Sequence, residues 1–128
     1  MIPDSVLFPA SMDGTWLQVA VDQSFNAVMI TSADLDGDGP LIEYCNPALC
    51  AMTGYSAHEL IGRSPRMLQG PLTDRAVLQR LRLCLEEGRV FLGSTVNYRK
   101  NGEPYQLEWN ISPVRDSAGK IQHFVSVQ

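Results

Sequence analysis

The chain has 128 residues, of which 45% are hydrophobic and 19% charged, and its formal net charge at pH 7 is −4. This length suits a single domain, and the acidic balance argues against a nucleic-acid surface. No apolar run approaches the roughly 18 residues of a membrane span, and the start lacks the pattern of a signal peptide. Cys45, Cys50 and Cys84 have no metal-ligand spacing. They predict reduced, packed thiols in a cytoplasmic protein.

The first half of the chain predicts an arm, three short helices and two strands. Prolines indicate an irregular start, so residues 1–24 are expected to form an arm that ends in a short amphipathic helix. The apolar positions of this helix are Leu17, Val19, Ala20 and Val21. Strands are expected over 26–31 and 41–45, with a turn rich in Asp and Gly between them.

Capping residues divide the next stretch into two helices. Asn46 is a good N-cap and Pro47 suits the first helical position, whereas Gly54 ends that helix. Ser56 caps a further short helix over 57–61.

The second half predicts one long helix and a three-stranded meander. Thr73 or Asp74 caps the helix and Gly88 ends it. Its core-facing stripe consists of Leu78, Leu81 and Leu85. Strands follow over 90–100, 104–114 and 121–128, joined by tight turns. This order predicts an α+β domain: a five-stranded antiparallel sheet with helices on one face.

Two stretches carry a family resemblance. Residues 62–70 read Gly-Arg-Ser-Pro-Arg-Met-Leu-Gln-Gly, and residues 71–76 continue as Pro-Leu-Thr-Asp-Arg-Ala. This segment resembles the Gly-Arg-Asn-Cys-Arg-Phe-Leu-Gln-Gly-Pro-Glu-Thr-Asp-Arg-Ala of LOV (light-oxygen-voltage) domains, the flavin-binding branch of the PAS family. The likeness runs from about residue 22 to the end. It implies a PAS fold over residues 25–128 and a flavin-binding photoreceptor role in blue-light signal transduction.

Pro65 departs from the family at its reactive position. LOV domains carry a cysteine there, whose thiol adds to the flavin under blue light, and proline has no thiol. The resemblance therefore implies a LOV-type domain without the cysteinyl-flavin adduct. One hypothesis is signalling by photoreduction, with Trp109 and the tyrosines as electron donors and a rotation of the Gln128 amide as the switch.

The resemblance also implies the flavin-binding residues. Arg66 and Arg82 match the two arginines that hold the flavin phosphate, and a guanidinium suits a phosphate because it binds bidentately. Gln69 matches the glutamine that reaches the flavin, and Ser64 replaces the usual asparagine. Asn46 either lies near this region or serves as a helix cap. The short connection over 62–73 favours FMN, with FAD as the alternative.

The ring end is expected to combine amides with an apolar wall. Asn97 and Gln128 match two of the three family residues for the pyrimidine edge, whereas Leu107 stands at the third, which is usually asparagine. Ser126 replaces a glycine. The expected wall consists of Met29, Leu41, Leu60, Leu68, Trp109 and Ile111.

Partners are expected on the opposite face of the sheet, which carries several apolar residues. We expect a homodimer through this outer face or the N-terminal helix, or docking of the arm onto the sheet. The chain ends within its last strand, so an effector domain outside it is expected, or action by partner exchange. His58 and His123 are expected at the surface, without a catalytic partner, and no enzyme is predicted.

Three hypotheses remain open. The first is an adduct-free flavin photosensor, and the second is a flavin redox sensor that uses the same residues. The third is a PAS domain without flavin that dimerises or binds another small ligand, which Pro65, Leu107 and Ser126 favour.

Overall fold

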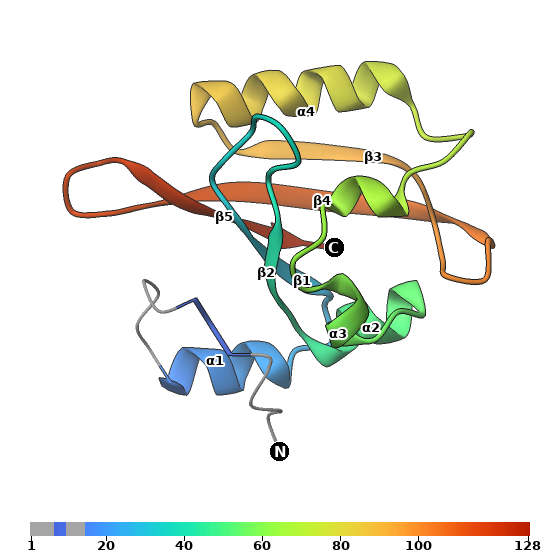
Figure 1. Ribbon diagram of the computed structural model, residues 1–128, viewed down its shortest axis with the longest axis horizontal. Coiled ribbons are helices and arrows are strands. Elements are labelled where there is room, and N and C mark those ends of the chain that lie inside the picture. Colours follow the sequence, from blue (N-terminus) through green and yellow to red (C-terminus); the bar gives the residue numbers. More distant parts are fainter. Residues whose placement is uncertain (1–6, 10–14) are drawn as a thin grey trace.

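The computed structural model describes residues 7–9 and 15–128, and its centre is one antiparallel sheet. The strands in chain order are β1 (Val28–Ser32), β2 (Ile42–Cys45), β3 (Phe91–Tyr98), β4 (Pro104–Arg115) and β5 (Ile121–Val127). They lie side by side in the order β2-β1-β5-β4-β3, and every neighbouring pair is antiparallel. The predicted α+β fold with a five-stranded antiparallel sheet is confirmed (Figure 1).

Most helices lie in the connection between β2 and β3. The helical elements are α1 (Thr15–Asp22), α2 (Pro47–Thr53), α3 (Ala57–Leu60), the 3-10 helix η1 (Pro65–Leu68) and α4 (Arg75–Glu87). In the described part of the chain, no helix is both long and apolar enough to cross a membrane.

The short helices begin and end at the predicted capping residues. Asn46 Oδ1 accepts the N–H of Leu49 at 3.0 Å, with Pro47 at the first helical position. Gly54 ends α2 with φ +80, a conformation that glycine adopts without steric cost. Ser56 caps α3 through a reciprocal capping box with Glu59.

The start of α4 is fixed to the sheet by two adjacent residues. Asp74, one of the two expected caps, accepts the N–H groups of Ala76 and Val77. Thr73, the other expected cap, instead joins the helix start to the sheet, because its hydroxyl donates to the carbonyl of Val96 in β3 at 2.6 Å. The helix is therefore held at its beginning against the strand that follows it.

Alternate residues of the central strands face opposite sides of the sheet. On one side, Ile30 and Tyr44 form a buried cluster that Val125, Val21 and Phe8 cover. Because Val21 belongs to α1, this helix lies on the outer face of the sheet. The expected docking of the N-terminal segment is confirmed for the described residues of that segment.

The buried side of α1 differs from the expected one. Gln18 is buried and accepts the N–H of Phe8 at 3.0 Å, whereas Leu17 and Val19 are each 39% exposed. The predicted helix is confirmed and Val21 packs against the sheet, but Leu17 and Val19 do not, because a hydrogen-bonded glutamine occupies the rest of the covered face.

His123 is a second correction. It was expected at the surface, as His58 was, but only His58 is exposed. His123 is 6% exposed, and its Nδ1 lies 2.9 Å from Glu43 Oε1. The reason is its place in β5, the central strand, where Ser32 and Val114 flank it in register.

Candidate functional site

A cavity of about 230 Å³ lies between the inner face of the sheet, η1 and α4. Most of the side chains predicted for a flavin site line it, among them Met29, Ser64, Arg66, Gln69, Arg82, Asn97, Leu107, Trp109, Ile111 and Gln128. They come from the five elements β1, η1, α4, β3 and β4 and from residues next to η1 and β5, so the fold brings distant parts of the sequence together.

The sheet wall of this cavity follows from strand register. Thr95 pairs with Leu107 across β3 and β4, and four residues further along β4 Ile111 pairs with Ser126 of β5. Ser126 in turn pairs with Met29 of β1. Paired residues of antiparallel strands point to the same face, so this row forms a continuous wall.

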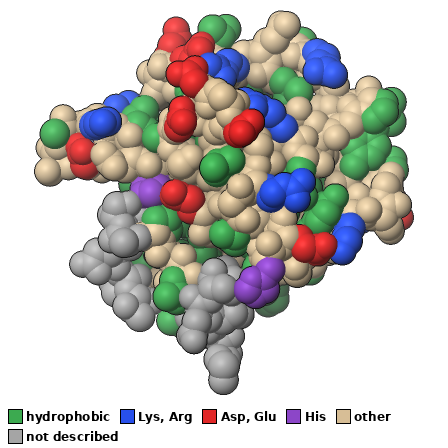
Figure 2. Space-filling view, in the orientation of Figure 1, with side chains coloured by type: hydrophobic (Ala, Val, Ile, Leu, Met, Phe, Trp, Pro, Cys, Tyr) green, Lys and Arg blue, Asp and Glu red, His purple; other side chains and the backbone are tan. Residues whose placement is uncertain are grey.

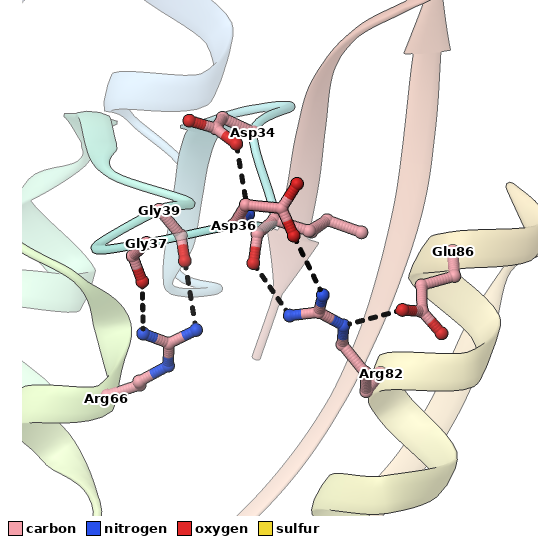
Figure 3. Close-up of polar contacts among 8 residues, drawn as sticks. Asp34, Asp36, Gly37, Gly39, Arg66, Arg82 and Glu86 are labelled. Carbon is pink, nitrogen blue, oxygen red and sulfur yellow. Dashed lines mark hydrogen bonds and ion pairs between the residues drawn. The ribbon is translucent and has the colours of Figure 1, made fainter.

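Arg66 reaches the mouth of the cavity from η1. This helix begins as α2 does, with a capping residue, Ser64, before Pro65. Arg66 Nη1 and Nη2 donate to the carbonyl oxygens of Gly37 and Gly39, at 3.3 and 3.0 Å (Figure 3). The 3-10 helix was not expected, although the Ser-Pro pair carried the signal for it.

Arg82 reaches the same loop from α4. Its Nη1 donates to the carbonyl of Leu35 at 2.7 Å, and its Nη2 lies 3.5 Å from Asp36 Oδ1. Its Nε donates to Glu86 Oε2 at 3.0 Å. Figure 3 shows both arginines pointing at the β1–β2 loop from two different elements. The pair therefore holds the loop that closes this end of the cavity.

The charges at this mouth nearly balance. Both carboxylates at this mouth, Asp36 and Glu86, contact Arg82, whereas Arg66 contacts only backbone carbonyls. Asp36 is 95% exposed, so water screens its attraction to Arg82. Figure 2 shows acidic and basic side chains side by side over the β1–β2 loop and the adjoining part of α4. An anion that binds the two arginines here would replace loop carbonyls and an exposed carboxylate as their partners. It would not have to break a buried ion pair.

The opposite end of the cavity carries amides. Asn97 is 7% exposed and shares a row with Tyr105, whose phenol has its pKa raised by burial. Gln128 Nε2 donates to Ser126 Oγ at 3.3 Å. Among the described residues, Gln128 Oε1 is buried and has no hydrogen-bond partner. A buried acceptor without a donor costs about 1–3 kcal/mol, so a ligand N–H is favoured at this point.

Three residues considered for the site lie outside it. Asn46 is fully buried and acts as the α2 cap, donating also to the carbonyls of Val21 and Asn26. Leu41 and Leu60, expected in the apolar wall, are not among the lining residues. Leu60 packs in the buried cluster behind the wall, which contains Ile42 and Leu49 and also the lining residues Met29 and Leu68. A side chain of the right polarity need not face the cavity.

Other lining residues were not predicted as part of the site. They are Thr31, Leu35, Pro40, Leu78, Leu81, Leu85, Thr95 and Phe124. The leucines of α4 had been identified as an inward stripe, so their periodicity carried the signal. Leu35 and Pro40 belong to the β1–β2 loop, whose path over the cavity has no signature in the sequence.

All three cysteines lie in the described part of the chain, and none lines the cavity. Within residues 7–9 and 15–128, no cluster of His, Cys, Asp or Glu is arranged to hold a metal ion. The chemistry that the cavity offers is therefore polar recognition at both ends of an apolar chamber.

Comparison with known proteins gives consistent matches. The model of the PAS domain family matches residues 26–128. The chain is 38% identical over 105 residues to Phototropin-2 of Oryza sativa subsp. japonica, covering 82% of this chain but only 12% of that protein. It is similar to a structure described as the light state of the blue-light photoreceptor Aureochrome1 LOV, with a TM-score of 0.76, 32% identity, and coverage of 85% and 84%. A second structure, "Flavin Analogue Sheds Light on Light-Oxygen-Voltage Domain Mechanism", matches with a TM-score of 0.82, 29% identity, and coverage of 93% and 86%.

Proposed function

Because the chain belongs to the PAS domain family, and its relatives include LOV photoreceptors, we propose that it is a flavin-binding sensory domain of the LOV type. The observation that carries the proposal is the cavity, because its lining includes both phosphate arginines and the amides Gln69, Asn97 and Gln128. We propose residues 25–128 as the sensor domain and residues 1–24 as an N-terminal arm and helix.

We assign the phosphate to the loop end of the cavity. Arg66 and Arg82 would exchange their contacts with the β1–β2 loop for bidentate contacts with the phosphate, which are stronger because the acceptor is charged. The cavity volume of about 230 Å³ is below the usual 300–1,000 Å³ of ligand pockets, so the proposal requires the phosphate to lie at the mouth, outside this volume. The short η1 connection favours FMN over FAD.

We assign the ring to the amide end. Asn97 and Gln128 each offer a donor and an acceptor. Gln128 Oε1 is a buried acceptor without a donor among the described residues, so it could accept an N–H of the ring. Gln69 and Ser64 also line the cavity, and we assign the ribityl chain to them. Leu107 leaves one position at the pyrimidine edge apolar. We therefore expect Leu107→Asn to bind flavin more tightly, by up to about tenfold.

The proposed mechanism forms no covalent bond between chain and flavin. Pro65 lines the cavity and has no thiol, and the three cysteines lie elsewhere. A bound flavin would supply light absorption and electron acceptance. Trp109, whose indole is packed 5.0 Å from the Phe91 ring, is the proposed electron donor. Gln128 is the proposed switch, because its amide adjoins the end of β5.

Two points of the proposal concern the wider protein. We propose a homodimer through the outer sheet face, where Leu92 is 65% exposed, or through α1, whose Leu17 and Val19 stay exposed. We also propose a cytoplasmic location and an effector domain outside this chain, which spans 12% of the length of the phototropin relative. Blue light and redox state are the two candidate stimuli.

The first test is an absorption spectrum of the purified protein before and after blue light. A structured absorption band of oxidised flavin is expected. Its light-induced conversion to the spectrum of a reduced flavin, and not to that of a cysteinyl-flavin adduct, would support photoreduction. Light-independent conversion by a reductant would favour the redox sensor. A colourless protein that takes up neither FMN nor FAD would overturn the proposal in favour of a PAS domain without flavin.

Arginine variants test the assignment of the phosphate. Arg82→Gln is expected to weaken FMN binding about tenfold or more and to leave riboflavin, which has no phosphate, unchanged. Arg89→Gln is the matched control, since Arg89 is also exposed and paired with a glutamate, Glu87, but does not line the cavity. Equal losses for both flavins would contradict the assignment.

A further inference from the structure

Two thiols outside the cavity lie in contact with each other. Cys45 Sγ and Cys50 Sγ are 4.0 Å apart, across the junction between β2 and α2. Cys45 is buried, whereas Cys50 is partly exposed. Cys84 lies in a different cluster, with Phe91 and Trp109. The chain therefore has one thiol pair and one separate thiol.

The two thiols of the pair are not equivalent. The hydrogen bond from the Cys45 thiol lowers the pKa of Cys50 to about 7, whereas that contact and burial raise the pKa of Cys45. The thiolate is the nucleophilic form of cysteine, so the lowered pKa favours Cys50 as the attacking thiol. The more exposed thiol is thus the more reactive one, and the buried thiol lies against it.

We propose that Cys45 and Cys50 form a redox-active dithiol that hydroperoxides convert into an intramolecular disulfide. In the first step the Cys50 thiolate attacks the terminal oxygen of the hydroperoxide and the O–O bond breaks. Cys50 becomes a sulfenic acid as hydroxide leaves from hydrogen peroxide, or alkoxide from an organic hydroperoxide. In the second step the Cys45 sulfur attacks the sulfenic sulfur, the S–O bond breaks, and water leaves with the Cys45 proton. Two electrons pass from the thiol pair to the peroxide.

The pair occupies a point where oxidation would act on its surroundings. A disulfide requires the sulfur atoms to approach to about 2.05 Å, so both side chains must move. The neighbours of Cys45 hold α1, because Tyr44 donates to Asp22 and Asn46 donates to the carbonyl of Val21. Cys45 also pairs in register with the cavity residue Met29. The site lies between the cavity and the outer helix and is independent of any flavin.

Thiol counting by mass spectrometry tests the proposal. Reduced protein is treated with hydrogen peroxide, denatured, alkylated and weighed intact. Of the three cysteines, wild type is expected to keep one alkylatable thiol after peroxide, and dithiothreitol should restore all three. After peroxide, Cys84→Ser should have no alkylatable thiol left. It should run as a single chain on a denaturing, non-reducing gel, which excludes bridges between chains. Cys50→Ser should form no bridge.

Several outcomes would overturn the proposal. They are the retention of three thiols, oxygen additions that dithiothreitol does not reverse, bridges between chains, and a bridge to Cys84 in the peptide map. Circular dichroism checks that each variant is folded. If Cys50→Ser does not fold, the peptide map of Cys84→Ser decides alone, because that variant keeps the pair intact.

Discussion

Replacing Asn46 with alanine removes four hydrogen bonds from a fully buried site. Asn46 Oδ1 accepts the N–H groups of Val28 and Leu49, at 2.9 and 3.0 Å. Its Nδ2 donates to the carbonyls of Val21 and Asn26, at 3.0 and 2.8 Å. One side chain thus joins the end of α1, the start of β1 and the start of α2.

The expected loss follows from the groups left without partners. Leu49 N–H keeps the Asn46 carbonyl as acceptor, and the Val21 carbonyl keeps the N–H of Ser24. The N–H of Val28 and the carbonyl of Asn26 lose the partner given above, which costs about 1–3 kcal/mol each. Loss of the N-cap adds about 1 kcal/mol. We expect a loss of about 3–7 kcal/mol, a large part of the 5–15 kcal/mol typical of a domain.

Urea unfolding followed by circular dichroism measures this loss. Asn101→Ala is the matched control, because Asn101 Oδ1 also accepts a backbone N–H, that of Glu103 at 2.9 Å, but in an exposed turn. The control should lose less than about 1 kcal/mol. A loss for Asn46→Ala as small as that of the control would refute the reasoning, and would mean that water replaces the amide.

Further predictions concern the cavity and the acid stability. Asp36→Asn removes a carboxylate that competes with the flavin phosphate for Arg82, so FMN affinity should rise about twofold to threefold. Riboflavin affinity, measured by fluorescence quenching, should stay constant. An equal change for both flavins would contradict this. Gly70→Ala would put a Cβ 2.3 Å from Tyr98 Cε1, so thermal unfolding should show a loss of about 1–3 kcal/mol, and an unchanged midpoint would count against it. The N–H of Lys120, followed by that of Ala118, holds the pKa of Asp116 below its ordinary value. The stability from Asp116 is therefore present above the unfolded carboxyl pKa of about 4, and it is lost as the pH falls from there through the lower pKa of the folded state. Asp116→Asn should flatten the dependence of the urea midpoint on pH. A curve parallel to that of the wild type would reject this linkage.

Local signals in the sequence were sufficient for most of the fold. Asn46, Ser56 and Asp74 cap the helices as expected, because a cap depends on a few neighbouring residues. The strands of the meander were also predicted within a few residues of their ends. What failed depended on contacts between distant segments. His123 is buried because β5 is the central strand, and strand order is not encoded in the alternation of one strand.

In the candidate site too, local motifs were predictable from the sequence, whereas contacts between distant segments were not. The family motif identified residues that line one cavity, but not the partners that Arg66 and Arg82 have in this structure. Those partners are mainly backbone carbonyls of the β1–β2 loop, and a carbonyl carries no sequence signature. Leu41 and Leu60 were wrongly placed in the wall because hydrophobicity alone does not say which side of a packed layer a residue faces.

The path from the cavity to the outer helix is short because the same two strands form both surfaces. In β1, Met29 lines the cavity and its neighbour Ile30 packs in the cluster under α1. In β5, Ser126 lines the cavity and Val125 packs against that same cluster. Adjacent residues of a strand point to opposite faces, so a displacement of either strand reaches both surfaces at once. A rotation of the Gln128 amide, at the end of β5, thus needs no chain of intermediate side chains to affect the packing of α1.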